Sequence, residues 1–237
     1  MSTPSSLPRP GGTRQLLTRI AALVVTYALM GAVLFLAAGR INWLDAWVFL
    51  IAYFLVAAVA QAWLARTNPD LAEERWQWGP NTKAWDKWIV PANGLLLFAL
   101  LIVIGLDSGR FEWSHVPWPV RVAALLGFVP AFSLPVLASR ANAFLASTVR
   151  IQQERGHAVA STGPYAVIRH PMYAGMILYD VCVPLLLGSW VGLAVSAVMI
   201  VLVILRTALE DRTLQAELPG YGEYAGRVRF RLLPGVW

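Results

Sequence analysis

The segment Ser161–Gly175 reads STGPYAVIRHPMYAG and leads from a polar loop into an apolar region. Pro171 suits the first turn of a helix, because the backbone N–H that proline lacks would have no partner there. The pattern therefore predicts a loop that ends at His170 and a helix from Met172 onward.

Four chemically capable side chains lie in this segment: Tyr165, Arg169, His170 and Tyr173. A chain whose only requirement was to be stable in lipid would not need these polar side chains. Arg169 and His170 precede the predicted helix, whose N-terminus offers free backbone donors and the positive end of the helix dipole. We expect an anionic ligand group to suit this position.

The composition indicates a membrane protein. Of 237 residues, 58% are hydrophobic and 14% are charged, and the mean hydropathy of +0.59 is far from that of a soluble domain. The net charge of +6 forms no continuous basic stripe, which argues against nucleic acid. Cys182 is the single cysteine and lies in an apolar run, so neither a disulfide framework nor a cysteine metal site is expected.

Apolar runs predict an all-α polytopic fold with about six transmembrane helices, since about 20 apolar residues cross a bilayer. The last run is long enough for a helical hairpin, with a turn at Pro184 and Gly188–Ser189. The runs are Ile20–Gly39, Ala46–Ala65, Ile89–Leu106, Val122–Ser139 and Met172–Leu205. Residues 1–13 are expected to be a disordered tail, residues 14–141 to hold the first four helices, and residues 142–237 to form the functional core.

Polar residues between and within these runs carry smaller expectations. Trp43 and Trp47 are expected at headgroup depth in a short turn. The loop Arg66–Lys87 is expected along the membrane surface. Asp45 and Asp180 are expected to be capped near helix ends or paired in the bundle.

The basic residues predict the orientation. With a cytosolic N-terminus, only Arg40, Arg110 and Arg121 of the 19 Lys and Arg residues fall on the other side. This bias is what the positive-inside rule expects. It places both termini, the 140–170 loop and the tail from Arg206 on the cytosolic side.

Arg206 and Glu210 are spaced i and i+4, so they share a helix face at the cytosolic end of the last span. A surface ion pair of a few tenths of a kcal/mol would explain the spacing. The alternative is a functional pair, because ionisable groups at a membrane helix end are candidates for function.

Other motifs exclude some classes of site. His115 is expected at the interface, whereas His157 and His170 flank one Gly-Pro-Tyr turn and are better candidates. They have no HExxH pattern, cysteine pair or third nearby histidine, so no metal is expected. The glycines form no dinucleotide-binding or P-loop pattern.

GPYAVIRHPMYAG at Gly163–Gly175, followed by Arg206, Glu210 and Asp211 and then by YGEYAGRVRFRLLPGVW, resembles the isoprenylcysteine carboxyl methyltransferase and phospholipid methyltransferase superfamily. These are integral membrane enzymes that use S-adenosylmethionine. The resemblance is strong over Asn142–Trp237 and weaker before it.

The resemblance implies a set of site residues. It assigns substrate contact to Arg206, while the acid–base candidates, should the acceptor carry a proton, are His170 and Glu210. The family's usual Glu-Glu is Glu-Asp here, which leaves the role of Asp211 open. The implied cofactor-binding residues are Gln152, His157, Ala158, Val159, Ala160, Tyr165, His170, Pro171, Met172, Tyr173 and Glu210, and the helix-start argument adds Arg169.

The chemistry of S-adenosylmethionine agrees with this assignment. Its ammonium needs an acid such as Glu210, its carboxylate a cationic or N–H-rich patch, and its adenine and sulfonium aromatic faces. Methyl transfer is an in-line displacement that depends mainly on alignment and desolvation. A carboxylate acceptor needs no general base, whereas an amine or thiol must lose a proton.

The predicted function is therefore S-adenosylmethionine-dependent methyl transfer to a lipophilic acceptor that enters from the membrane lipids, most simply a prenylcysteine-type carboxylate. A phospholipid amine or a small thiol is an alternative acceptor. Two other classes stay open. One is an NADPH-dependent, sterol-reductase-like enzyme, for which Arg227, Arg229 and Arg231 would be the phosphate-binding cluster, and the other is a non-enzymatic membrane transport or scaffold protein.

Overall fold

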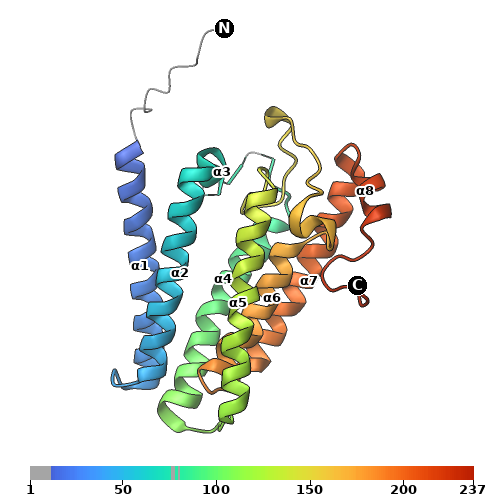
Figure 1. Cartoon of the computed structure of the whole chain (residues 1–237). Helices are drawn as coiled ribbons and strands as arrows, with labels where there is room; N and C mark the ends of the chain where they lie inside the picture. Colours follow the sequence, from blue (N-terminus) through green and yellow to red (C-terminus); the bar gives the residue numbers. More distant parts are fainter. Residues whose placement is uncertain (1–11, 76–77, 80) are drawn as a thin grey trace.

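The computed structural model describes residues 12–75, 78–79 and 81–237. Residues 1–11 of the expected tail lie outside the described residues, and Gly12 and Thr13 begin the first helix. The described ranges contain helices and connecting loops and no strand, which confirms the all-α prediction (Figure 1).

In the described part of the chain, six longer helices run side by side (Figure 1). Short helical segments lie at their ends, among them a π-helix, η1, that continues α4. The long helices are α1 (Gly12–Ala38), α2 (Leu44–Thr67), α4 (Asp86–Ile104), α5 (Trp118–Ala141), α6 (Pro171–Leu186) and α7 (Gly192–Glu217), and the short ones are α3 (Pro69–Glu74), η1 (Gly105–Phe111), η2 (Gln153–Arg155), η3 (Gly163–Ala166) and α8 (Tyr221–Arg227).

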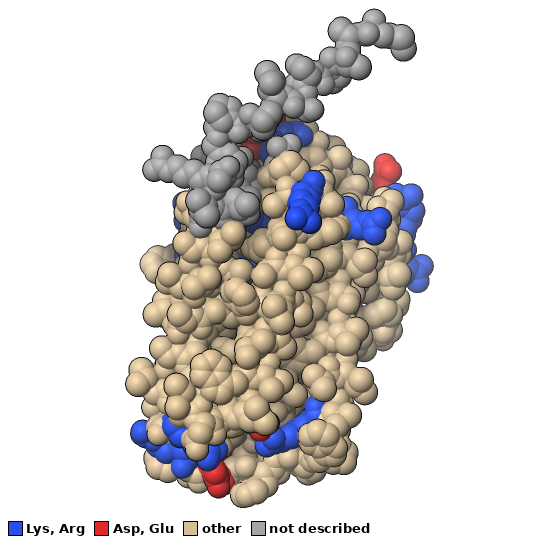
Figure 2. Space-filling view, turned by 60° about the vertical axis from the view of Figure 1, so that its left-hand side comes forward, with Lys and Arg blue, Asp and Glu red and all other residues tan. Residues whose placement is uncertain are grey.

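The helices identify an integral membrane protein. Five are long and apolar enough to cross a bilayer: α1, α2, α5, α7, and α4 together with η1. The sixth, α6, has 16 residues and so a length of about 24 Å, shorter than the hydrocarbon core of about 30 Å. It lies between α5 and α7 in the bundle (Figure 1). Charged side chains gather at the two ends of the molecule, and the face between them is uncharged (Figure 2).

Close packing of α5 against α6 follows from a proline and a glycine. Pro135 lacks the N–H that would bond the carbonyl of Ala131 four residues earlier. Gly175 of α6 sits against this place, since a Cβ there would lie 2.6 Å from Pro135 Cδ and 2.8 Å from the Ala131 oxygen. The start of α6 is thereby held against α5.

The predicted hairpin turn between α6 and α7 is confirmed. Gly188 has a φ of +84°, which glycine adopts without strain. The neighbouring Ser189 donates to the carboxylate of Asp107 at 2.5 Å, and Ser114 donates to the same oxygen at 2.6 Å. This end of the bundle also holds the predicted pairing of Asp45, whose partner is Arg121 at 2.9 Å.

Three expectations need correction. Trp43 is buried in the core, although Trp47 is exposed. Asp180 is buried, and its Oδ2 has no hydrogen-bond partner among the described residues. The segment from Arg206 is not a tail at its start, because α7 continues to Glu217. The helix outlasts its apolar residues, so the hydropathy marks the membrane boundary and not the helix end.

The start of α1 and the end of α7 lie at the same end of the bundle, together with α8 and the loop that joins α5 to α6 (Figure 1). Sequence elements far apart in the chain therefore meet on one face of the membrane-spanning bundle.

Candidate active site

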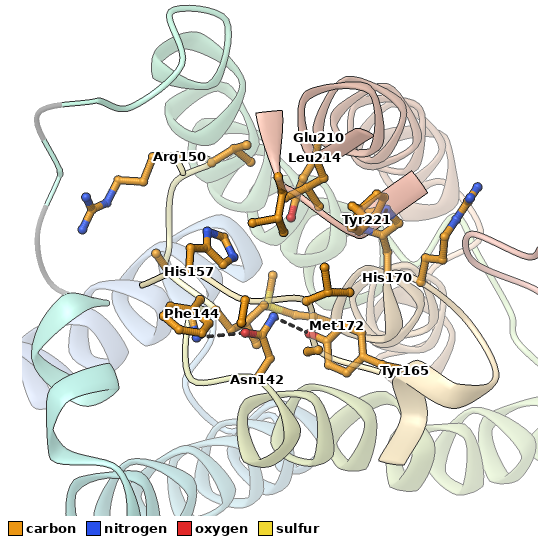
Figure 3. Close-up of a pocket in the computed structure, with 18 of the residues that line it drawn as sticks. Asn142, Phe144, Arg150, His157, Tyr165, His170, Met172, Glu210, Leu214 and Tyr221 are labelled. Atoms are coloured by element: carbon orange, nitrogen blue, oxygen red, sulfur yellow. Dashed lines mark hydrogen bonds between the residues drawn. The ribbon is translucent and has the colours of Figure 1, made fainter. Parts of the chain in front are cut away.

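A pocket opens on this face between the end of α5, the loop of residues 142–160, the start of α6, the end of α7, and α8 (Figure 3). Most of the predicted site residues line it. They are His157, Ala158, Val159, Ala160, Tyr165, Arg169, His170, Met172, Tyr173 and Glu210. The spacing of the sequence motifs thus corresponds to one place in the fold.

Three predicted residues do not line the pocket. Gln152 is fully buried within the loop, where its amide donates to the carbonyl of Phe144 at 2.7 Å and its oxygen accepts from Arg155. Pro171 is buried as the first residue of α6. Arg206 lines a second cavity, deeper in the bundle. Gln152 and Pro171 therefore shape the pocket wall without facing a ligand.

An aromatic stack forms one side of the pocket. The ring of His157 lies on that of Phe144, with centroids 4.6 Å apart and an interplanar angle of 28°. The Arg155 guanidinium lies near the same ring, 5.5 Å from its centroid. Asn142 holds the backbone here, since its Oδ1 accepts from the Phe144 N–H at 2.8 Å (Figure 3). The stack offers a flat face to a planar ligand.

His157 is neutral at physiological pH. Burial, followed by the positive charges of Arg155 and Arg150, lowers its pKa from 6.5 to about 4. Its Nδ1 accepts a hydrogen bond from the Gln152 N–H at 3.3 Å. A neutral ring does not repel a cationic ligand.

Two tyrosines close the opposite side of the pocket. Tyr165 receives a hydrogen bond on its hydroxyl from Asn142 at 3.3 Å, and Tyr224 of α8 donates to the Tyr165 carbonyl at 2.7 Å. Burial raises the pKa of Tyr165 above its usual range and that of Tyr224 to about 12. Both hydroxyls therefore stay protonated, and α8 is tied to the loop after α5.

Asp211 is the centre of a buried network next to the pocket. Its carboxylate is fully buried and lies 3.2 Å from His170 Nε2 and 3.2 Å from Arg169 Nε. It also accepts from Tyr221 at 3.0 Å and from Arg231 at 2.9 Å. Asp211 does not line the pocket, so its role is to hold the residues that do.

The C-terminal tail occupies backbone donors that the sequence suggested were free. The N–H of Arg169 donates to the Phe230 carbonyl and that of His170 to the Arg231 carbonyl, both at 2.9 Å. The Arg169 side chain faces Asp211. The anion site expected at these two residues is thus reduced to the His170 ring and the first turn of α6.

Arg231 is also committed within the fold. Besides its bond to Asp211, its guanidinium lies 4.8 Å from the ring centroid of Trp237. The run of Arg227, Arg229 and Arg231 therefore does not present three free cations for a nucleotide phosphate.

Glu210 reaches the pocket from α7. Tyr173, on the first turns of α6, donates a short hydrogen bond to its Oε2. The Tyr173 ring stacks near that of His170, at 5.8 Å and 22°. This places one half-buried carboxylate against aromatic rings, which suits a cationic group.

Arg206 does not form the surface ion pair that its spacing allowed. It donates to both carboxylate oxygens of Asp86, at 2.7 and 3.0 Å, and to the Ser147 carbonyl at 2.8 Å. Its guanidinium lies 5.2 Å from the Tyr173 ring centroid. Arg206 therefore stands between the pocket and the deeper cavity.

Sequence reasoning missed Asp86 and Phe144. Asp86 is fully buried at the start of α4, where it also accepts from the Val149 N–H at 2.7 Å. In the sequence it is one of several charges in a polar loop, and nothing local marks it. Phe144 had a weak signal, as an aromatic residue two positions after the Asn142 that ends a span.

The fold and the pocket define a helical membrane protein with a polar site at one membrane face. Residues 122–216 match the isoprenylcysteine carboxyl methyltransferase (ICMT) family, so the family resemblance is confirmed over this stretch. The match covers α5, the pocket loop, α6 and nearly all of α7, and it begins before Asn142 and ends before the tail. No curated protein shows significant similarity to the chain. Taken together, the match and the fold indicate a membrane methyltransferase.

Proposed function

We propose that the protein transfers the methyl group of S-adenosylmethionine to a lipophilic acceptor at the cytosolic membrane face. The observation that carries this proposal is the pocket itself, in which Glu210, two tyrosines and the His157–Phe144 stack face one space. The basic-residue bias supports the cytosolic assignment of this face and of both termini.

The residues present fit the cofactor's chemical groups. Glu210 supplies the anion for the ammonium, the His157–Phe144 stack a surface for the adenine, and His170 with the first turn of α6 the positive end for the carboxylate. The enclosed part of the pocket measures about 60 Å³, which is too small for the whole cofactor. The cofactor would therefore also fill the open mouth of the pocket. When bound, the cofactor supplies an electrophilic methyl group on a sulfonium.

The protein's own residues position the cofactor and the acceptor and exclude water from them. Neutral His157 adds no positive charge to the pocket, and Tyr173 fixes the carboxylate of Glu210. Such alignment accounts for much of the rate of an in-line displacement. Because Arg206 faces the deeper cavity and lies over Tyr173, we assign to it contact with the acceptor.

A carboxylate acceptor of prenylcysteine type fits this arrangement most simply. The Nη1 of Arg206 lies outside the bonds to Asp86 and Ser147 and can donate to a carboxylate, which is already a nucleophile at neutral pH. With an amine or thiol acceptor a proton would have to leave. His170 Nδ1 would then be the receiving atom, because Nε2 already faces Asp211 at 3.2 Å.

Calorimetric titration of the detergent-purified protein with S-adenosylhomocysteine tests the proposal. We expect saturable binding that Glu210→Gln weakens about tenfold or more, since a charge-assisted bond is lost. Glu223→Gln, at an exposed position of α8, is the matched control and should bind like wild type. Absence of binding to a folded wild-type protein would reject the methyltransferase, and NADPH would be titrated next.

A further inference from the structure

A second cavity lies deeper in the bundle, among α2, α4, α5, α6 and α7, and measures about 390 Å³. Its wall is largely apolar, with residues such as Leu97, Phe132 and Met199. At one end it reaches Arg206, whose guanidinium lies over the Tyr173 ring. Tyr173 in turn bonds Glu210 in the polar pocket. The cavity thus ends beside the proposed cofactor site, and we call it the inner chamber.

Buried polar atoms that lack hydrogen-bond partners line the inner chamber. Asn93 Oδ1 and Asp180 Oδ2 are buried without a hydrogen-bond partner among the described residues, and both residues line it. Asp180 is 3% exposed. Its backbone is fixed, because the Asp180 carbonyl accepts from Ser196 at 2.6 Å. A buried acceptor without a partner costs free energy that a ligand donor would recover.

The positions of these residues along the helices set a distance. Asp180 follows Tyr173 on α6 by seven residues, and Asn93 follows Asp86 on α4 by seven residues. Seven residues make two turns, or about 10 Å. Tyr173 and Asp86 both contact Arg206. The unsatisfied acceptors therefore lie about 10 Å from Arg206 along the bundle.

We propose that the inner chamber binds the apolar part of the methyl acceptor, and that Asp180 and Asn93 accept a hydrogen bond from a hydroxyl or amino group carried on it. The inference rests on the proposed function. It narrows the acceptor to a lipophilic molecule with a donor group about 10 Å from its reacting end, and it makes Asp180 a determinant of specificity. An unsubstituted hydrocarbon chain, a plain prenyl group included, would leave the buried carboxyl unpaired, so among carboxylate acceptors the inference favours one whose chain carries a donor.

The test compares octadecanoic acids that share a carboxylate and differ at carbon 10: hydroxy, amino, methoxy and unsubstituted. Binding to the detergent-purified protein is measured calorimetrically in the presence of S-adenosylhomocysteine. We expect the hydroxy or the amino acid to bind about tenfold tighter than the methoxy and unsubstituted acids. Equal binding of all four would overturn the proposal.

Variants of Asp180 identify the acceptor atom. Asp180→Leu should make the protein bind the four octadecanoic acids with about equal affinity. Asp180→Asn keeps an acceptor oxygen and should therefore retain a preference for the hydroxy acid. It lacks the carboxyl group and should lose any preference for the amino acid. Asp45→Asn, at the opposite end of the bundle and outside the inner chamber, is the control and should keep the wild-type order. A preference that survives Asp180→Leu would overturn the assignment.

A bulky residue tests the chamber itself. A Cβ at Gly94 would meet no atom within 4 Å, and Gly94 lines the chamber. Gly94→Phe should weaken all four acids about equally and leave the affinity for S-adenosylhomocysteine unchanged. Unchanged acid binding would show that the acids lie elsewhere. Because S-adenosylhomocysteine is titrated separately, loss of its binding in wild type would instead reject the proposed function.

Discussion

Asp86 holds Arg206, which lies 120 residues away in the chain. Arg206 donates hydrogen bonds of 2.7 and 3.0 Å to the two carboxylate oxygens of Asp86. The same carboxylate accepts from the Val149 N–H. One buried side chain at the start of α4 therefore fixes both the arginine on α7 and the loop that carries the aromatic stack.

Replacing Asp86 by Ala should lower the free energy of unfolding by about 3–5 kcal/mol, because it leaves the Arg206 charge buried and unpaired. Thermal unfolding in detergent, followed by tryptophan fluorescence, measures the loss. Asp45→Ala removes a half-exposed pair with Arg121 and should cost about 1 kcal/mol or less. The double variant Asp86→Leu/Arg206→Met should recover much of the stability. A single-variant loss no larger than that of the control would contradict the role of Asp86.

Asp211→Asn should loosen the C-terminal tail. The neutral side chain no longer offsets the charges of Arg169 and Arg231, both within 3.2 Å of the carboxylate. Hydrogen exchange of the backbone amides from Arg231 to Trp237 should accelerate about tenfold or more, since local opening becomes easier. Glu223→Gln provides the control. Exchange as slow as in wild type would mean that backbone bonds alone hold the tail.

The spans and the pocket motif could be predicted, because each is encoded locally. Hydropathy locates α1, α2, α4 and α5, and Pro171 marks the start of α6. The pairing of Asp86 with Arg206 could not be predicted, because no single segment determines the order of the helices around the bundle.

The partners of Asp211 were equally hidden. Its neighbours on α7 are apparent from the i+4 spacing to Gln215, but Arg231 and Tyr221 reach it only after the chain has turned at Gly220. Asp180 shows the reverse case. A lone carboxylate in an apolar run predicts a partner, and the structure provides an open chamber in its place.

His157 predicts a defined pH dependence. Its pKa is about 4 in the folded protein, against 6.5 for a histidine in the unfolded chain, so between these values the unfolded chain binds the extra proton. Stability therefore rises with pH through this window and falls as the pH is lowered from about 6.5 towards 4. His157→Gln should show a smaller loss of unfolding temperature between pH 7 and pH 5 than wild type does. His115→Gln, at an exposed position in the loop between η1 and α5, is the control, and a slope equal to wild type in His157→Gln would contradict the assignment.

Phe144 should contribute to ligand affinity through its flat face. Phe144→Ala removes the ring on which His157 lies at 4.6 Å, and an aromatic contact of this kind is worth about 0.5–1.5 kcal/mol beyond the area buried. We expect the affinity for S-adenosylhomocysteine to fall about tenfold, as measured by calorimetry. Phe144→Tyr keeps the ring and should bind within about twofold of wild type. Phe111→Ala, in η1 at the opposite end of the bundle, controls for the loss of an aromatic side chain. If Phe144→Ala binds as tightly as Phe144→Tyr, the ligand does not use this stack, and the adenine must lie against Tyr165 on the other side of the pocket.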